Sequence, residues 1–464
     1  MSLPARFSRV LDPNAPSSQL AELFLGEGFD LFLVGGSVRD AFLGSGEDND
    51  LDYTTIARPA DIKRIMSPWA DELFAVGEAF GTIGAIKDGY LIEVTTFRAE
   101  VYRAESRKPE VSFSDDIETD LSRRDFTANA MALKLGSEPA LIDPYGGLSD
   151  IAAKVLRTPL APEIAFEDDP LRMLRMYRFV SQLGFTPDES AVAATRSMAD
   201  RLSIVSAERI RDELIKLLQG EHVEEGLWGL IDSGLAEQFL PELPALALEV
   251  DPDHHHKDVL AHTIAVVGKA PPNEDVRLRL AALLHDIGKP ATREFEGRRV
   301  TFHHHEVVGA RMARDRMRQL RFPKDVVTDV QQLVYLHMRP HTFKMGWTDR
   351  AVRRYVRDAG HLLAELNTLV RCDVTTRSER REQQIQRQID ELEERIEELG
   401  QKEELASMRP PIDGNAVMAH LGIEPGRPVG EAMDMLLEHR IDHGPYDEAE
   451  AFALLDAWWE RRSK

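Results

Sequence analysis

Two aspartates, Asp50 and Asp52, stand two residues apart in the stretch DLDYTT (residues 50–55). The tyrosine and the threonines favour a β-strand, and side chains two residues apart on a strand lie on the same face. Two carboxylates held side by side repel each other unless a cation lies between them. Mg²⁺ bound by a few carboxylates and by substrate phosphates is common in phosphoryl and nucleotidyl transfer. The pair therefore predicts a Mg²⁺ site, with Asp50 and Asp52 as metal ligands and catalytic residues.

A third carboxylate is expected on a neighbouring strand. Glu93 fits, because it lies in the middle of LIEVT (residues 91–95), whose β-branched and apolar residues also favour a strand. An acid inside a strand is costly unless it has a partner or faces water. Glu93 is thus a candidate third catalytic carboxylate, and an acid on an exposed strand face is the alternative.

A glycine pair follows the apolar residues FLV (32–34), which predict a buried strand. Gly35 and Gly36 let backbone amides approach a phosphate, and the helix predicted over residues 38–43 begins directly afterwards. A glycine pair alone is equally typical of an ordinary turn. Beside the two aspartates it predicts a nucleotide-binding turn at Gly35 and Gly36.

Six motifs between residues 31 and 180 occur in the order GGSVRDAFLG, DLDYTT, EVTTFRAEVY, DLSRRDFTANAM, DPYGGLSDI and EDDPLRMLRMYRF. Together they resemble the family of class II tRNA nucleotidyltransferases and bacterial poly(A) polymerases. The resemblance implies that Gly36 and Arg39 contact the nucleoside triphosphate, that Asp50 and Asp52 bind Mg²⁺, and that Arg124 contacts the nucleotide. It also implies a five-stranded head followed by a helical neck, body and tail.

The segment that begins at Asp169 has two interpretations. Asp169 followed by Pro170 is typical of a helix start, where the carboxylate caps the helix. Capping does not explain Arg172, Arg175 and Arg178, which recur every three residues and predict a slanted basic ridge.

The second interpretation of this segment is base selection. Cytosine and adenine both present a ring nitrogen that accepts a hydrogen bond beside an amine that donates one. An aspartate beside an arginine matches this pattern and leaves unpaired groups against uracil or guanine. In the resembled family, the aspartate and the first arginine of this motif contact the base and the later arginines contact the nucleotide. Asp169 and Arg172 occupy the first two positions here.

Histidines are concentrated in the middle of the chain, where ten of the fifteen fall between His254 and His341. Imidazoles and carboxylates that converge from separate helices are typical of metal sites. The stretch LLHDIGKP (283–290) resembles the HD phosphohydrolase domain. The alternative is that these residues serve only as scaffold. The candidate ligands of a second divalent metal are His262, His285, Asp286, His305, His337 and Asp373.

The elements that must position these residues change along the chain. Residues 30–135 alternate short β-branched runs with turn signals and helical stretches, whereas from about residue 165 apolar residues recur three and four apart. We therefore predict an α+β fold, with a small α/β head followed by an all-helical neck, HD domain and tail. The expected parts are a nucleotidyltransferase head (1–155), a neck with the nucleotide-selecting motif (156–245), an HD domain (246–377) and a tRNA-binding tail (378–464). A heptad pattern within 378–405 predicts a helix that packs on the protein's own body.

Composition restricts the class of protein. With 43% hydrophobic and 30% charged residues, no long apolar run and no signal-peptide pattern, we expect a cytoplasmic globular protein without a membrane partner. The 80 acidic and 57 basic residues give a net charge of −23, so RNA must bind to local basic patches. Candidates are the Arg172 series, the cluster Arg353, Arg354 and Arg357, and the cluster Arg377, Arg380 and Arg381.

The leading hypothesis is an enzyme that transfers CMP and AMP from CTP and ATP to the 3′ end of tRNA with Mg²⁺. A poly(A) polymerase would share every motif of the head, although an acidic surface suits a processive RNA polymerase less well. An HD phosphohydrolase with a nucleotide-binding head and a noncatalytic RNA-binding protein are further alternatives. The intact pair Asp50 and Asp52 argues against both of these.

Overall fold

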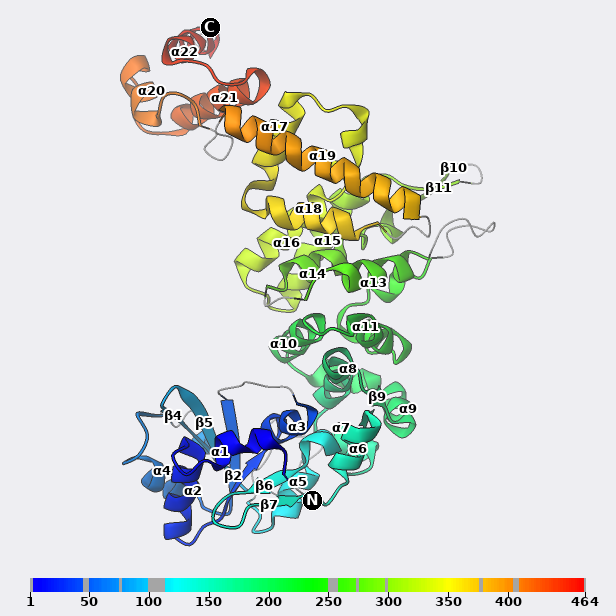
Figure 1. The fold of residues 1–464 in the computed structure, drawn as a ribbon. Coiled ribbons are helices and arrows are strands. Elements are labelled where there is room, and N and C mark those ends of the chain that lie inside the picture. Colours follow the sequence, from blue (N-terminus) through cyan, green and yellow to red (C-terminus); the bar gives the residue numbers. More distant parts are fainter. Residues whose placement is uncertain are drawn as a thin grey trace. The chain divides into compact units, whose positions relative to one another are not determined.

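The structure is a computed structural model, and it describes residues 3–44, 50–74, 77–98, 113–248, 258–272, 275–296, 299–374, 379–403 and 409–462. Its contacts divide the chain into two compact units, Met1–Phe239 and Leu240–Lys464 (Figure 1). The mixed α+β character of the fold confirms the predicted class. The finer division into head, neck, HD domain and tail remains a prediction.

The first unit begins with a seven-stranded sheet in the order β3-β4-β5-β2-β1-β6-β7. The implied number of five strands is therefore wrong, because the short strands β3 and β7 extend the sheet at its two edges through antiparallel pairing. The strands are β1 (Leu31–Val34), β2 (Asp50–Thr55), β3 (Glu72–Phe74), β4 (Thr82–Lys87), β5 (Tyr90–Thr96), β6 (Ala132–Lys134) and β7 (Ala140–Ile142).

Apolar contacts cover part of each face of the central strands. On one face, buried Tyr53 of β2 reaches α2, where its hydroxyl and that of Ser17 lie 2.6 Å apart. On the other face, Phe32 of β1 packs in a cluster with Leu121 of α5. The helices of this part are α1 (Ser8–Leu11), α2 (Pro16–Gly26), α3 (Gly36–Leu43), α4 (Pro59–Met66), α5 (Ile117–Ser122) and α6 (Gly147–Ala153).

Helices make up most of the rest of the first unit. The 13-residue helix α8 packs against both α10 and α11, and its apolar residues Leu174, Met176 and Phe179 are buried. These helices are α7 (Pro162–Asp168), α8 (Leu171–Leu183), α9 (Glu189–Met198), α10 (Ala207–Leu218), α11 (Val223–Asp232) and α12 (Ala236–Phe239). The two-residue strands β8 (Val155–Leu156) and β9 (Thr186–Pro187) pair in parallel beside them.

In its described residues, the second unit is helical apart from the hairpin β10 (Arg293–Glu296) and β11 (Arg299–Phe302). Its helices are α13 (Val259–Lys269), α14 (Arg277–Leu284), α15 (His305–Gln319), α16 (Lys324–Leu336), α17 (Asp349–Ala359), α18 (Leu363–Cys372), α19 (Glu379–Glu403), α20 (Gly414–Leu421), α21 (Arg427–His443) and α22 (Glu448–Arg462). Within the described residues, no helix is both long and apolar enough to cross a membrane.

The heptad segment forms α19, and the structure confirms that it packs on the protein's own body. Ile389, Leu392 and Leu399 are buried, and Leu399 lies in an apolar cluster with Val352 of α17. The hydrophobic seam of this helix is thus covered within one chain.

The predicted basic cluster Arg353, Arg354 and Arg357 is engaged in internal contacts. Buried Arg353 donates to the carbonyl oxygen of Ile441, whereas Arg354 and Arg357 both form ion pairs with Glu438. Arg377, in the last cluster, lies outside the described residues. The cluster on α17 therefore joins helices within the unit.

Candidate active site

The three predicted carboxylates lie on one face of the head sheet. Along β2, Leu51 and Tyr53 are buried whereas Asp50 and Asp52 are exposed, which is the alternation that the strand requires. Strands β2 and β5 pair in parallel, and their register places Asp52 directly beside Glu93. Glu93 is exposed as well. The structure thus brings Asp50, Asp52 and Glu93 together.

The proximity of these acids changes their acid–base properties. The pKa of Asp52 is raised, chiefly because surrounding protein displaces water from its carboxylate, while Arg124 opposes this shift and the charge of Asp50 adds to it. The pKa of Glu93 is raised by partial desolvation and by the charges of Asp52 and Asp50. Such a cluster of carboxylates binds a proton or a divalent cation more readily than a separate acid does.

The glycine turn lies at the end of β1, next to Asp52. Gly35 has a φ of 74°, and a Cβ atom there would lie 3.2 Å from Nη1 of Arg124. Both observations favour glycine at this position. The helix α3 starts at Gly36, two residues before the predicted start.

Arg39 on α3 is oriented by two neighbours. Its Nε and Nη2 atoms donate to the carboxylate of Asp40, and Nη1 donates to Oδ1 of Asn129 at 2.8 Å. A guanidinium has five N–H groups, so two of them are left for a ligand.

A cavity of about 890 Å³ connects the carboxylate face with the helices that follow the head. Asp52 lines it at one side and Lys216 of α10 is among the residues at the other. All eight predicted nucleotide-binding residues line this cavity: Gly35, Gly36, Arg39, Arg124, Asp169, Arg172, Arg175 and Arg178. The structure therefore unites the glycine turn and the Asp169 segment in one site.

Asp169 lies at the joint between α7 and α8 and makes two contacts. Its Oδ1 accepts a hydrogen bond from the backbone N–H of Leu171 at 3.1 Å, as the capping interpretation predicts. Its Oδ2 accepts from Nη2 of Arg209 on α10 at 2.7 Å. A carboxylate offers about four lone-pair positions, so capping leaves room for a base amine.

Arg172 is held by backbone carbonyls. Its Nη1 donates to the carbonyl oxygen of Ala165 at 3.1 Å, and its Nη2 donates to that of Arg123. These contacts fix the plane of the guanidinium beside Asp169. An acceptor and a set of donors thus face the same cavity.

Arg175 and Arg178 are anchored by two buried acids, Asp125 and Glu213, whose role the sequence motifs did not indicate. Arg175 pairs with Asp125 and, at 3.1 Å, with Glu213 of α10, while Nε of Arg178 lies 2.9 Å from the second oxygen of Glu213. Burial lowers the pKa of Arg178 to about 10, a shift that the charge of Arg175 reinforces and Glu213 opposes. Glu213 could have been recognised from the sequence, because it is an acid on the apolar face of α10 that contains Ile210, Leu214 and Leu217.

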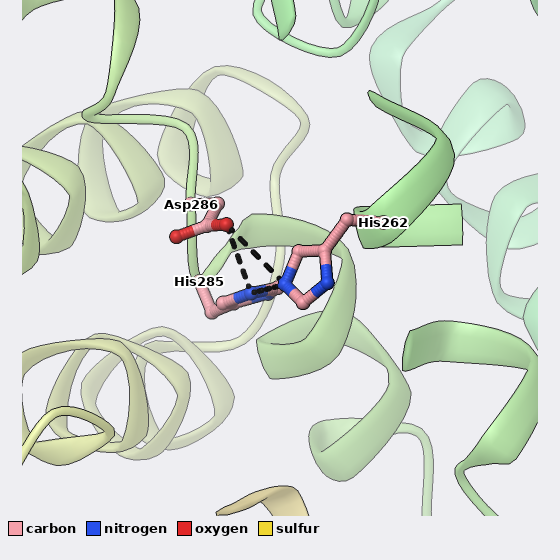
Figure 2. A group of neighbouring side chains, drawn as sticks. All are labelled: His262, His285 and Asp286. Atoms are coloured by element: carbon pink, nitrogen blue, oxygen red, sulfur yellow. Dashed lines mark hydrogen bonds and ion pairs between the residues drawn. The ribbon is translucent and has the colours of Figure 1, made fainter. Parts of the chain in front are cut away.

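A second candidate site lies in the helical unit, where all six predicted metal ligands come together. His262 comes from α13, the pair His285 and Asp286 directly follows α14, and Asp373 follows α18. His305 opens α15 and His337 follows α16. Figure 2 shows the His262 ring turned toward His285 and Asp286. His262 Nε2 lies 3.6 Å from Asp286 Oδ2 and 2.9 Å from Asp373 Oδ1.

Two further residues of this cluster were missed. Nε2 of His341 lies 3.2 Å from Oδ2 of Asp373, and Nζ of Lys289 lies 2.6 Å from Oδ2 of Asp286. Gly288 permits the tight packing, because a Cβ atom there would lie 2.2 Å from the carbonyl oxygen of His305. The four imidazoles and two carboxylates are a donor set that suits a divalent transition metal better than Mg²⁺.

Three family models match the chain. They are the "Poly A polymerase head domain" over residues 31–157, the "Probable RNA and SrmB-binding site of polymerase A" over residues 184–246, and the "HD domain" over residues 254–394. The first match contains the carboxylate face and the glycine turn, and the third contains the histidine cluster.

Curated relatives match over different lengths. The chain is 33% identical to the A-adding tRNA nucleotidyltransferase of Deinococcus radiodurans over 442 residues, which cover 92% of this chain and 95% of that relative. It is 41% and 42% identical to the CCA-adding enzymes of Latilactobacillus sakei and Bacillus subtilis, over 48% and 46% of this chain. These alignments cover 55% and 52% of the two enzymes, or about half of their length.

Solved structures share the fold over nearly the whole chain. The Bacillus stearothermophilus CCA-adding enzyme in complex with CTP aligns with a TM-score of 0.70 and 25% identity, covering 100% of this chain and 99% of that one. The Thermotoga maritima CCA-adding enzyme complexed with tRNA aligns with a TM-score of 0.60 and 16% identity, covering 99% and 100%.

Proposed function

We propose, from the premise that this chain belongs to the tRNA nucleotidyltransferase family, that it adds CMP and AMP from CTP and ATP to the 3′ end of tRNA. The observation that carries the proposal is the single cavity lined by both Asp52 and the pair Asp169 and Arg172. The nucleotide that reacts beside Asp52 is then the same molecule whose base contacts Asp169 and Arg172. The relatives named CCA-adding and A-adding support the same substrate class.

The acidic face would supply the metal-dependent part of the reaction. Nucleotidyl transfer in this family depends on a divalent metal, and we assign Mg²⁺ to Asp50, Asp52 and Glu93. When bound, Mg²⁺ stabilises charge on the transferred phosphoryl group and lowers the pKa of the attacking hydroxyl. These carboxylates lie on one face of the two paired strands β2 and β5, so they would hold the ion together.

The remaining residues bind and orient the nucleotide. Amides at Gly35 and Gly36 approach the triphosphate, and Arg39 and Arg124 neutralise its charge as the tRNA 3′ hydroxyl displaces pyrophosphate from the α-phosphorus. Asp169 accepts a hydrogen bond from the exocyclic amine of cytosine or adenine, and Arg172 donates to the ring nitrogen. Arg175 and Arg178 add positive charge to the cavity wall while Glu213 holds them in place.

The proposal is tested with tRNA that lacks its three terminal nucleotides. Supplied with CTP and ATP, the protein should extend this tRNA by three residues and then stop, as judged by gel electrophoresis and sequencing of the 3′ end. A long adenosine tail made from ATP alone would identify a poly(A) polymerase instead. No extension of any RNA would contradict both functions.

A second candidate function is addition of the terminal adenosine alone. It is favoured by the alignment to the A-adding relative, which extends over 92% of this chain. In that case tRNA ending in CC should be extended by one residue with ATP, whereas tRNA lacking all three nucleotides should not react with CTP.

The dependence on Mg²⁺ should change with pH. The raised pKa values of Asp52 and Glu93 mean that protons compete with the metal at a higher pH than for ordinary carboxylates. We therefore expect the Mg²⁺ concentration for half-maximal addition to rise as pH falls from about 8 to about 5. Glu93→Gln should show a weaker rise, because one competing proton is removed. A Mg²⁺ requirement that is constant over this range would contradict the assignment.

We also propose that the histidine cluster binds a divalent metal and hydrolyses a phosphoester. The support is geometric, because His262, His285 and Asp286 place their ligand atoms within 4.8 Å of one another. A double change of His285 and Asp286 to alanine should abolish metal-dependent phosphate release without reducing nucleotide addition. Unchanged phosphate release in that variant would overturn the assignment.

A further inference from the structure

One phenylalanine ring in the wall of the active-site cavity lies close to three guanidinium groups. The Cζ atoms of Arg178, Arg39 and Arg175 lie 3.8, 5.2 and 5.7 Å from the centre of the Phe179 ring. Phe179 is 4% exposed, and it lines the cavity together with all three arginines. Buried Phe126 meets the ring edge to face, with 5.7 Å between the ring centres, and so fixes its orientation. A cation within about 6 Å of an aromatic centre is attracted by the electron-rich face of the ring.

The three arginines come from two helices. Arg175 and Arg178 precede Phe179 by four residues and by one residue on α8, so Arg175 lies one helical turn away on the same face as the ring. Arg39 comes from α3, which follows the glycine turn of the head. The ring of Phe179 therefore links, through side chains, the helix behind the glycine turn with the helix that begins at the base-selecting motif.

Hydrogen bonds connect the same two helices beside the ring. Nη1 of Arg39 donates to Oδ1 of Asn129 at 2.8 Å, and Nδ2 of Asn129 donates to Oδ1 of Asp125 at 2.9 Å. Oδ2 of Asp125 accepts from Nε of Arg175 at 3.0 Å. The guanidinium groups of Arg39 and Arg175 are thus held at the ring by a continuous chain of polar contacts.

Three cations at one place are unfavourable without compensation. Burial, and then the charges of Arg175 and Arg39, lower the pKa of Arg178, which shows that the three groups destabilise one another. Asp125 and Glu213 offset part of this repulsion through ion pairs. A further carboxylate would offset more of it, but its charge would repel a triphosphate. An aromatic ring attracts the cations without adding a negative charge to the cavity wall.

We infer that Phe179 is a positioning residue for nucleotide binding, whose ring holds the guanidinium groups of Arg39, Arg175 and Arg178 together at the cavity. The inference rests on the proposed function, because these arginines are assigned there to the incoming nucleotide. It adds a residue that acts through its π-electrons and that contributes to the binding of CTP and ATP alike, because it acts on groups other than Asp169 and Arg172.

The test replaces Phe179 in the full-length protein with mono-, di- and trifluorophenylalanine by suppression of a stop codon at this position. Fluorine withdraws electrons from the ring face in steps while the ring keeps nearly the same size. The dissociation constants of CTP and ATP, measured by equilibrium dialysis with Mg²⁺ and without tRNA, should rise in steps to about tenfold with the trifluoro ring. The rate of addition at saturating nucleotide should change less than about twofold, because the contacts are the same before and during the reaction.

The matched control is the same fluorinated series at Phe166. Phe166 is a fully buried phenylalanine on α7 of the same unit, and among the described residues no guanidinium lies over its ring. This series should leave both dissociation constants unchanged.

The outcomes separate the inference from the proposed function. Dissociation constants that are equal across the Phe179 series, in a protein that extends tRNA, would overturn the inference alone. An equal loss of affinity in the Phe166 series would overturn it as well, because the effect would then come from packing. If Phe179→Leu weakens binding and the fluorinated rings do not, the ring acts by its volume and the inference fails. Absence of CTP and ATP binding in the unmodified protein would overturn the proposed function.

Discussion

Replacing Asp52 with alanine is expected to lower the rate of nucleotide addition by at least about 100-fold. A bound metal contributes several kcal/mol to the stability of the transition state, and a loss of about 3 kcal/mol corresponds to roughly 150-fold in rate. Asp50→Ala should have a similar effect, because both acids lie on the exposed face of β2. The rate is measured under single-turnover conditions with CTP or ATP and tRNA that lacks the corresponding 3′ nucleotide.

This loss should not come from unfolding. Burial displaces water from the carboxylate of Asp52 and Asp50 repels it, and Arg124 offsets only part of this cost, so removal of the carboxylate should leave the thermal midpoint unchanged or slightly higher. Glu72→Ala is the matched control, because Glu72 is an exposed acid on β3 of the same sheet and lies outside the cavity. It should keep the full rate. An Asp52→Ala protein that retains more than about a tenth of the rate would contradict the metal-binding role.

Asp169→Asn is expected to relax nucleotide choice. The amide can turn and offer a donor where the carboxylate accepted, so UTP and GTP should gain relative to CTP and ATP. A lost acceptor that faces a buried amine costs roughly 1 to 3 kcal/mol, or about five- to 150-fold in rate. Competition of the four triphosphates on tRNA lacking its 3′ end measures the preference.

Stability and base choice can be separated at this position. Asparagine caps helices about as well as aspartate, and the ion pair with half-exposed Arg209 is worth less than about 1 kcal/mol, so stability should fall only slightly. Asp188→Asn is the matched control. Asp188 caps α9 through the backbone N–H of Ser190 and pairs with Arg157 at 3.0 Å, and it is not among the cavity residues. If Asp169→Asn, like Asp188→Asn, leaves the nucleotide preference unchanged, Asp169 acts only as a helix cap.

Local periodicity was sufficient to predict the acidic face. Spacing by two places Asp50 and Asp52 on the same side of a strand, and the structure has them there. The position of Glu93 on a neighbouring strand also followed from its apolar surroundings, although the parallel register with Asp52 did not. Registers between strands are set by the whole sheet, which a single stretch of sequence does not specify.

Some contacts between distant segments were not predicted from the sequence, because no motif contains both partners. Arg209 is 40 positions from Asp169, and Glu213 is 38 from Arg175, so no short motif contains either pair. The contact of His341 with Asp373 was not predicted for a similar reason, because the packing of α18 brings Asp373 to His341. The edge strands β3 and β7 are three residues each, too short to give a clear alternation.

The parallel pairing of β2 with β5 also determines where the head can tolerate a change in length. The connection between the two strands, residues 56–89, contains α4, β3 and β4, and it returns to the sheet before Glu93. Ladder hydrogen bonds fix the separation of Asp52 and Glu93 whatever the length of that connection. Residues inserted at the exposed Asp88–Gly89 turn would therefore leave the acidic face intact, whereas one residue inserted within Leu91–Glu93 would turn Glu93 to the opposite face.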